Sequence, residues 1–569
     1  IDDWFYRLEW KESPIFSDKE GLFISGGIWV LFIDEQGIGE EISRLLAGCG
    51  QTCITVRPAD HYLNAGDGRY FIRPSVFEDY RELFHDTSLN TQNICGILHL
   101  WTCTEIRSSL HSIDDLFQSQ ETGIISFFNL LKAISNSKRA RNPRIMMVTN
   151  YAALVTAEDS YIFPDKSMLL GLARVGDQEI RNICLNCVDV DTIGHGVDET
   201  ASWIFSELRN ERMKDDLISA WRDGKRYTQQ LARLNTEEGI SEPVKIQDGK
   251  VYIIAGGAGE AGLEICRYLA REAKVNLVII NRIMLPDKSS WRQLEDKYDE
   301  TITRRVRELL QLEEMGSEVT YIAQDISDAA KLKEAVEGIK SRYGVINGII
   351  NSTMHIHEML IEDMTIDDFR EAIKAKVSGT YLLHEYTKDQ NLDFFLLYSS
   401  AASYLGGIGL GGYAPANAFM DGFAQYYRRR GLNIMSLNWS NLELSLLDRN
   451  DRDGFEKSLV YPINAEDYRE IIGKLLRMDC PQITIADINF SKLAKVLKQL
   501  KINFDPNLLK TLHKENRYQV EPQDRERVME AFEELKQLIL SREEVRDILQ
   551  RDVEIGAQFT ALEELLKNI

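Results

Sequence analysis

Four residues in the second half of the chain carry groups suited to proton transfer: Lys376, Ser400, Tyr413 and Asn417. Asn417 follows Tyr413 at a spacing that places both side chains on one face of a helix. Reduction of a ketone by hydride needs a proton for the developing alkoxide, and a tyrosine with a pKa near about 10 releases its proton reluctantly. A nearby ammonium would lower that pKa, and a serine hydroxyl could hold the same oxygen. Taken singly, each residue would equally suit an ordinary structural role.

A glycine-rich turn upstream could hold a dinucleotide. Residues 251–270 read as a strand, a glycine-rich turn and a helix, which is the context that gives a G-x-G-x-x-G pattern its meaning. Such a turn lets the backbone approach a pyrophosphate at the positive end of the helix. Glu260 lies in the same turn, where its charge would oppose the phosphates unless it points outward. The predicted cofactor-binding glycines are Gly256, Gly257, Gly259 and Gly262.

Two residues at strand ends indicate which cofactor to expect. The strand "VNLVIINR" ends at Arg282 rather than at a carboxylate, and an arginine there suits a 2′-phosphate, which favours NADPH over NADH. Asp325 could accept a hydrogen bond from the adenine amine, although it would also suit a helix N-cap. We predict no metal site, because the pair His355 and His357 has no evident third ligand and the Cys-x-x-Cys at 184–187 has no second pair.

The surrounding elements must position these residues. Apolar runs of strand length alternate with longer helical patterns in two successive stretches of the chain, which predicts two α/β units with parallel sheets. Residues 28–47 align without a gap to 251–270, as expected after a duplication. In the first copy Asp34 stands where the second has Gly257, so that a carboxylate takes the place of a phosphate. We therefore expect the first copy not to bind a dinucleotide.

The predicted fold class is α/β, with two Rossmann-like, doubly wound parallel-sheet subdomains and a helical C-terminal extension. The N-terminal, degenerate structural half spans 1–235, the catalytic half spans 236–495, and the extension spans 496–569. The boundary lies in the polar segment 231–250, which glycine and proline interrupt. The extension has amphipathic spacing, and it either packs on a neighbour or is a solvated connector.

Composition excludes several classes of protein. A chain of 569 residues is too long for one small core, and its net charge of −22 disfavours nucleic acid as a partner. Hydrophobic residues make up 44%, yet no run approaches the roughly 18 apolar residues that a membrane span needs. The chain starts without a signal-peptide pattern, and its eight scattered cysteines suit reduced thiols, which predicts a cytoplasmic protein.

The second half resembles the catalytic half of ketoreductase domains from modular type I polyketide synthases, a branch of the short-chain dehydrogenase/reductase superfamily. In that family a lysine and an asparagine exchange the places they hold in ordinary short-chain dehydrogenases, and Lys376, Ser400, Tyr413 and Asn417 match this arrangement. The first half resembles the family's degenerate structural half, including "FYRLEW" and "LLGLARV". Residues 286–319 resemble insertions found in ketoreductases of trans-acyltransferase assembly lines.

The resemblance implies that NADPH reduces a 3-ketoacyl chain, carried on the phosphopantetheine arm of an acyl carrier protein, to the hydroxyacyl thioester. It also implies neighbouring synthase domains in a polyketide or hybrid polyketide/peptide synthase. The family's stereochemical markers are absent: Ile356, His357 and Glu358 stand for Leu-Asp-Asp, and Leu405 stands for a tryptophan. The configuration of the alcohol is therefore not predicted. Two alternatives remain open, a catalytically silent scaffold or docking domain and a free-standing reductase of small ketones.

Overall fold

The computed structural model describes twelve stretches of the chain: 1–15, 27–85, 94–105, 112–137, 143–181, 183–210, 216–235, 244–293, 298–443, 459–489, 501 and 503–505. The predicted helical extension, 496–569, lies outside the described residues except at 501 and 503–505. Within the described stretches, every helix lacks either the length or the hydropathy that a membrane crossing requires.

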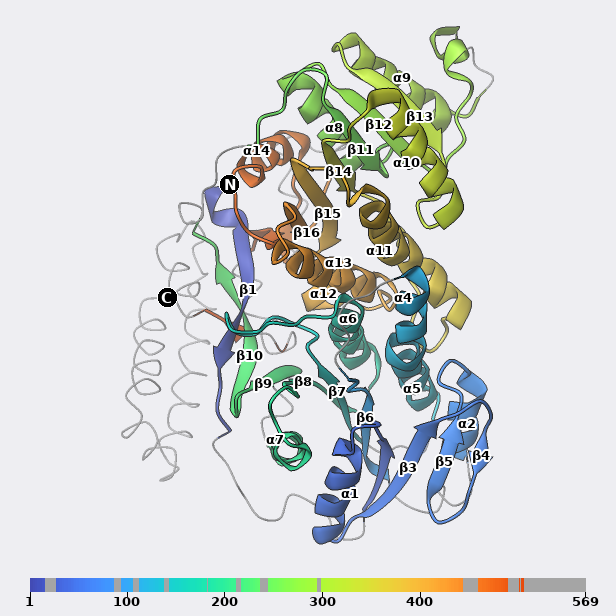
Figure 1. Ribbon diagram of the computed structural model, residues 1–569, viewed down its shortest axis with the longest axis vertical. Coiled ribbons are helices and arrows are strands. Elements are labelled where there is room, and N and C mark those ends of the chain that lie inside the picture. The colour runs from blue at the N-terminus through green and yellow to red at the C-terminus, as the bar shows by residue number, and fades with distance from the viewer. Residues whose placement is uncertain are drawn as a thin grey trace, which may run out of the picture. The chain divides into compact units, whose positions relative to one another are not determined.

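The catalytic half is built on a parallel sheet whose strand order reverses between its first and fourth strands (Figure 1). From one edge to the other, hydrogen bonding gives the order β13, β12, β11, β14, β15, β16, β18. Binding crevices open at such a reversal, outside the carboxyl ends of the strands. The strands are β11 (Val251–Ala255), β12 (Asn276–Asn281), β13 (Glu318–Ala323), β14 (Gly348–Asn351), β15 (Phe394–Ser400), β16 (Ile434–Trp439) and β18 (Gln482–Ile485).

The N-terminal half repeats this order in its own parallel sheet, β5, β3, β2, β6, β7, β8, β9. Its strands are β2 (Ile28–Phe32), β3 (Thr52–Pro58), β5 (Arg69–Ile72), β6 (Ile94–Thr102), β7 (Arg144–Asn150), β8 (Cys184–Val190) and β9 (Ile218–Arg222). The shared order is what the internal alignment predicts, and the predicted α/β class with two Rossmann-like halves is confirmed.

Helices cover the faces of both sheets, as alternating strands and helices require (Figure 1). In the first half they are α1 (Ile38–Gly48), α2 (Phe77–His85), α4 (Ile113–Gln120), α5 (Ser126–Ser135), α6 (Pro164–Glu179) and α7 (Val197–Leu208). In the second they are α8 (Glu260–Glu272), α9 (Glu300–Glu314), α10 (Ala329–Tyr343), α11 (Ile366–Thr387), α12 (Ala402–Leu405), α13 (Tyr413–Arg428) and α14 (Ala465–Leu475).

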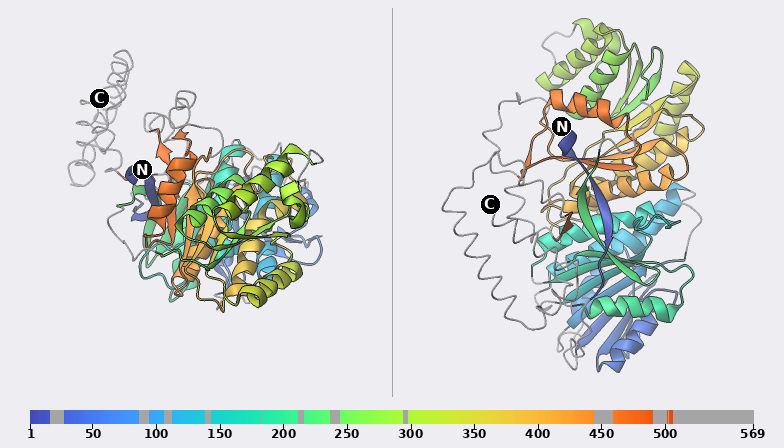
Figure 2. Two further views of the ribbon diagram at one scale, coloured as in Figure 1. Left: turned by 90° about the horizontal axis from the view of Figure 1, so that it is seen from above. Right: turned by 90° about the vertical axis from the view of Figure 1, so that its left-hand side faces the viewer.

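One strand from the start of the chain connects the two halves. β1 (Phe5–Glu12) pairs antiparallel with β18, with Phe5 opposite Ile485. The neighbouring β10 (Lys225–Arg233) belongs to the first half, and the amide of Ser13 donates to the carbonyl of Arg226 at 2.8 Å. Both sheets thereby become parts of one continuous sheet, with β1 and β10 side by side in the right-hand view of Figure 2.

Residues 1–229 and 234–502 group into one compact unit that contains both Rossmann-like halves. Among the described residues, 230–233 and 503–505 group into a second, in which Leu231 lies opposite Phe504 of the short parallel strand β20 (Asn503–Phe504). The predicted division at residues 235 and 495 stays a prediction.

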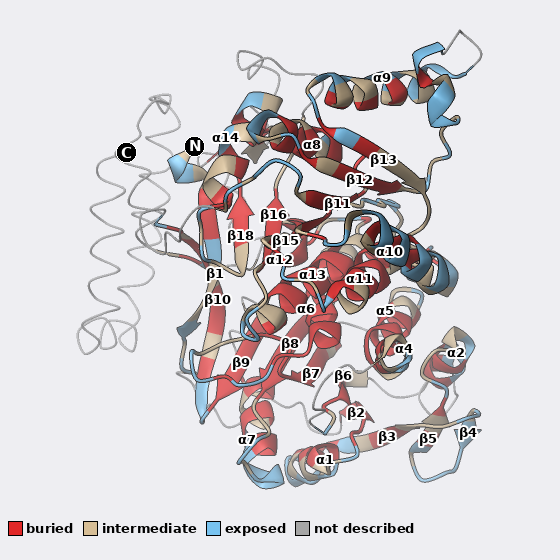
Figure 3. Cartoon of the chain, turned by 45° about the horizontal axis from the view of Figure 1, so that its top comes forward, coloured by how far each residue is buried: buried red, intermediate tan, exposed pale blue. Residues whose placement is uncertain are grey.

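Helix α6 of the first half supports helix α13 of the second. A Cβ atom on Gly171 of α6 would lie 2.7 Å from the carbonyl oxygen of Ala414, and one on Gly422 of α13 would lie 2.2 Å from the Ser167 hydroxyl. Glycine at these contacts therefore lets two helix backbones approach closely. Both helices are largely buried (Figure 3). The first half thus fixes the helix that begins at Tyr413.

In the first half, the side chain of Asp34 occupies the turn between β2 and α1. The buried carboxylate of Asp34 accepts hydrogen bonds from the amides of Gln36 at 2.9 Å, Ile38 at 3.2 Å and Gly39 at 2.7 Å. These amides lie at the start of helix α1, where a Rossmann fold would receive a phosphate. The carboxylate occupies the place that the sequence comparison with the second half assigns to it.

Candidate functional site

The turn between β11 and α8 has a geometry that only glycine suits at two positions. Gly256 has a φ of +82°, and a Cβ atom there would lie 2.8 Å from the carbonyl group of Ser352. A Cβ atom on Gly262 would lie 2.5 Å from the carbonyl oxygen of Gly256. Gly259 is the N-cap residue of α8, whose first amides point out of the turn. The turn can therefore bring its backbone close to a pyrophosphate, as a dinucleotide requires.

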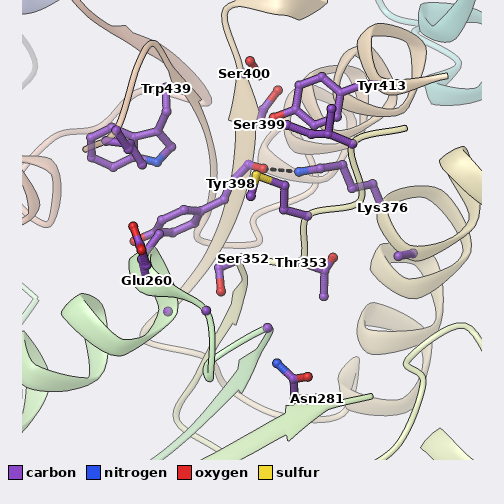
Figure 4. A pocket seen from close by; sticks show the side chains of 18 of the residues that line it. Glu260, Asn281, Ser352, Thr353, Lys376, Tyr398, Ser399, Ser400, Tyr413 and Trp439 are labelled. Carbon is purple, nitrogen blue, oxygen red and sulfur yellow. Dashed lines mark hydrogen bonds between the residues drawn. The ribbon is translucent and has the colours of Figure 1, made fainter. Parts of the chain in front are cut away.

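A cavity of about 720 Å³ lies against this turn, at the carboxyl ends of the strands. Figure 4 shows Lys376, Ser400 and Tyr413 together on one side of it, with Asn281 and Glu260 across from them. The predicted site residues that line the cavity are Gly256, Gly259, Gly262, Arg282, Asp325, Lys376, Ser400 and Tyr413. The other two, Gly257 and Asn417, are buried and do not line it.

Lys376 reaches the cavity from helix α11 and lies beside Tyr413. Its ammonium nitrogen donates to the backbone carbonyl of Tyr398 at 2.5 Å and lies 5.7 Å from the centroid of the Tyr413 ring (Figure 4). The side chain is buried, and this burial lowers the pKa of Lys376 to about 7, while the negative charge of Asp421 acts in the opposite direction. The lysine can therefore exchange between charged and neutral forms near neutrality.

Tyr413 is the first residue of α13, and its side chain is half-buried. Burial raises the pKa of Tyr413, and hydrogen bonding to Ser400 and Asn417 offsets only part of that rise. In the structure burial outweighs the other contributions, and the expected lowering of this pKa by the Lys376 ammonium stays a prediction. The phenol stays protonated at neutral pH, which is the form that a proton donor must have.

Ser400 and Asn417 complete the predicted group of four. Ser400 ends strand β15, and its hydroxyl accepts a hydrogen bond from the Ala402 amide at 3.2 Å, so it also supports the start of the short helix α12. The side-chain amide of Asn417 donates to the carbonyl of Tyr413 at 2.8 Å. Its buried side-chain oxygen has no partner among the described residues, which leaves an acceptor for a water molecule or a cation.

Arg282 and Asp325 lie where the sequence places them, at the ends of β12 and β13. Arg282 forms an ion pair with Glu371 at 3.3 Å, and a terminal nitrogen lies 3.5 Å from His355. Asp325 accepts from the amide and hydroxyl of Ser327, which contributes to lowering the pKa of Asp325, although burial opposes the shift. The N-cap of helix α10 is Asp328. The alternative role of Asp325 as that N-cap is therefore not the one observed.

Sequence reasoning missed one charged residue of the cavity wall. Arg305 of helix α9 lines the cavity, and its Nε donates to the carbonyl oxygen of Ala258, in the glycine-rich turn, at 3.3 Å. Arg305 lies in the segment 286–319, and no motif spacing connects that segment to the turn. The only signal in the sequence is the arginine-rich stretch "TRRVRE". Glu260 also lines the cavity, so it does not point wholly away from the expected phosphates.

Comparison with family models identifies both halves. Residues 250–443 match the model described as KR domain, and residues 29–207 match the one described as Beta-ketoacyl synthase-like, N-terminal. A phenolphthiocerol/phthiocerol polyketide synthase of Mycobacterium tuberculosis (strain CDC 1551 / Oshkosh) is 27% identical over 329 residues, 58% of this chain and 17% of its own length. Polyketide synthase PksN of Bacillus subtilis (strain 168) is 25% identical over 423 residues, 72% of this chain and 7% of its own.

Solved structures share the fold. An N-terminal ketoreductase from the macrolactin assembly line has a TM-score of 0.72 at 20% identity, covering 87% of this chain and 93% of that one. A multidomain structure with adenylation, ketoreductase and pseudo Asub domains, from a keto acid-selecting NRPS module, has a TM-score of 0.74 at 24% identity, covering 90% of this chain and 43% of that one.

The chain spans less than a fifth of the length of these two curated synthases. Its matched segments coincide with the two Rossmann-like halves, and the cavity lies in the half that the KR model matches. Residues 250–443 thus belong to the KR domain family, and the two relatives named above are polyketide synthases.

Proposed function

We propose that this chain uses NADPH to reduce a 3-ketoacyl thioester on an acyl carrier protein to the hydroxyacyl thioester, during polyketide or hybrid polyketide/peptide biosynthesis. One observation carries the proposal: the glycine-rich turn and the side chains of Lys376, Ser400 and Tyr413 open on the same cavity. A hydride donor held by the turn and a proton donor could therefore approach one carbonyl group.

The residues of this chain have distinct roles in the proposed reaction. The nicotinamide, when bound, would supply the hydride; the turn and Arg282 and Asp325 would hold its dinucleotide. Tyr413 would give its phenolic proton to the carbonyl oxygen, to which the Ser400 hydroxyl would donate a hydrogen bond. The ammonium of Lys376, 5.7 Å from the Tyr413 ring centroid, would stabilise the phenolate left behind.

NADPH rather than NADH is favoured by the charge at the end of β12. A Rossmann fold that uses NADH commonly has a carboxylate there, which holds the ribose diol. In this chain the position is Arg282, an exposed guanidinium that lines the cavity. An arginine suits the additional phosphate because its planar donors match phosphate oxygens.

The acyl carrier protein and the neighbouring synthase domains are proposed partners, supported by relatives that are polyketide synthases of much greater length. Origin in a trans-acyltransferase assembly line stays a prediction from residues 286–319. A silent scaffold domain and a free-standing reductase of small ketones remain the rivals that an experiment must separate.

The test is a reduction assay with carrier-bound and free ketones. The chain is incubated with NADPH and with 2-ketoacyl or 3-ketoacyl thioesters on an acyl carrier protein, or with free ketones of the same carbon skeleton. We expect NADPH fluorescence to fall and the 3-ketoacyl carrier to gain the mass of one hydrogen molecule. Binding of NADPH without turnover of any ketone would favour the scaffold, equal turnover of free ketones would favour the free-standing reductase, and preference for the 2-ketoacyl carrier would correct the position of the ketone.

Gly262→Ala tests the cofactor cradle directly. The new methyl group would lie 2.5 Å from the carbonyl oxygen of Gly256 and must push the turn apart. Overpacking of this kind costs about 1–3 kcal/mol, so we expect the Kd for NADPH to rise about tenfold or more in a fluorescence titration. Gly338→Ala, in open space on helix α10, is the control and should bind NADPH as the parent does. An unchanged Kd in Gly262→Ala would mean that the dinucleotide binds elsewhere.

A further inference from the structure

Helix α9 is firmly attached to the second half of the chain, in which it connects the parallel strands β12 and β13. Asp299 caps its start by accepting from the Ile302 amide at 2.9 Å, and Val306, Leu309 and Leu312 are buried in the core. An ion pair between Glu308 and Arg267 ties it to helix α8. Side chains on α9 therefore have fixed positions relative to the glycine-rich turn, which α8 follows.

The guanidinium of Arg305 lies beside a part of the chain that a dinucleotide would contact, because its Nε donates to the carbonyl oxygen of Ala258 in the turn at 3.3 Å. Its positive charge also acts on Tyr321, whose hydroxyl donates to the carbonyl oxygen of Ile283, just beyond β12, at 2.7 Å. In a Rossmann fold the ribose 2′ position lies at the end of this strand.

We propose that Arg305 binds the 2′-phosphate of NADPH together with Arg282, so that helix α9 contributes to the choice of NADPH over NADH. The inference rests on the proposed function, because it concerns the cofactor of that same site. Both guanidinium groups line the one cavity, and they come from different elements, α9 and the end of β12.

Of the two arginines, Arg305 is the better candidate for a strong contact with the 2′-phosphate, because the two differ in their carboxylate partners. Arg282 already shares its charge with Glu371 at 3.3 Å. Arg305 has no carboxylate within ion-pair distance among the described residues, and its Nε bond to a carbonyl leaves both terminal nitrogens as donors. It is also partly buried, and a charge removed from water interacts more strongly with a phosphate.

The carboxylate of Glu260 is a second reason to expect an arginine such as Arg305 near a bound phosphate. Glu260 is the first residue of α8 and lines the cavity beside the turn, where its carboxylate would repel a phosphorylated ligand. The cavity is also lined by the carboxylates Asp325 and Glu358 and by the cationic side chains Arg282, Arg305 and Lys376. Each arginine therefore offsets part of the negative charge that an added phosphate would meet.

The test compares Arg305→Ala with Arg304→Ala and Arg307→Ala. All three variants remove one arginine from the same helix, but Arg304 and Arg307 are exposed and do not line the cavity. Fluorescence titration gives the Kd values of NADPH and NADH, and circular dichroism checks the fold. Hydrogen bonds to charged groups contribute enough binding free energy that Arg305→Ala should raise the Kd for NADPH about tenfold to a hundredfold. The Kd for NADH should change less than about twofold in Arg305→Ala, and both control variants should bind NADPH with the affinity of the parent.

A fragment separates the phosphate contact from indirect effects on the turn. Adenosine 2′,5′-bisphosphate should displace bound NADPH from the parent chain, and its affinity should fall in Arg305→Ala while that of adenosine 5′-monophosphate stays the same. If Arg305→Ala lowers the affinity for NADPH and NADH equally, Arg305 only stabilises the turn through Ala258. If it lowers neither affinity, Arg282 alone binds the 2′-phosphate. Either result overturns the proposal. A parent chain that binds neither dinucleotide would overturn the proposed function and this inference together.

Discussion

Tyr413→Phe should lower kcat for ketone reduction by about 10²–10⁴-fold, the range that a positioned proton donor contributes. The variant keeps the aromatic ring that lies 5.7 Å from Lys376 and loses only the hydroxyl. Since the turn that would hold the dinucleotide belongs to a different element, the Kd for NADPH should stay the same. Single-turnover reduction of a ketoacyl carrier thioester and an NADPH fluorescence titration measure the two quantities.

Tyr426→Phe is the matched control for this variant. Tyr426 lies on the same helix and stacks against Arg430, away from the cavity-lining residues. It should keep both the parent rate and the parent affinity. Full turnover in Tyr413→Phe would remove Tyr413 from the proton-transfer step, whereas a joint loss of turnover and NADPH affinity would point to a structural role at the start of α13.

Lys376→Met should lower kcat by about 10²–10³-fold, as expected when a preorganised electrostatic contact to the developing charge is removed. Methionine is similar in length and suits a buried position, so the fold should survive. Lys388→Met is the control, because Lys388 is exposed beside Glu385 and far along the chain from the cavity residues of α11. A rate in Lys376→Met equal to that of the parent would show that the charge is not used.

The pH dependence of the same variant tests the charge state of the lysine. Burial lowers the pKa of Lys376 to about 7, so the side chain is an ammonium below that pH and neutral above it. The pKa of Tyr413 is raised, so its phenol remains protonated across this range. The rate of reduction by the parent should therefore fall as the pH rises through about 7. A profile of Lys376→Met that keeps this fall would assign it to another group.

Much of the fold could be predicted because local patterns determine it. The ungapped alignment of residues 28–47 with 251–270 identified two related halves, and the substitution of Asp34 for Gly257 identified the one whose turn is filled. Buried parallel strands give continuous apolar runs, which the sequence displays openly. The partnership of β1 with β18 has no such pattern, because an edge pairing between distant segments depends on tertiary packing.

The residues that form the site could largely be predicted from the sequence, but the pKa shift of Tyr413 could not. The spacing of Tyr413 and Asn417 and the order of Lys376 and Ser400 predicted which residues to examine, and three of these four line the cavity. The sign of the pKa shift of Tyr413 was not predictable, since burial is a property of the assembled core. Arg305 was missed for a related reason: the helix after β12 can approach the turn in space without any spacing rule in the chain.

The pairing of β1 with β18 has a consequence for how this polypeptide is made. Translation produces β1 long before β18, so the edge of β1 that pairs with β18 stays unpaired until β18 has been made. Contacts between such distant segments form slowly, and an unpaired edge left exposed in the meantime can join another chain. Nascent copies on neighbouring ribosomes would therefore be most vulnerable to misassociation through Phe5–Glu12 until synthesis has passed Ile485.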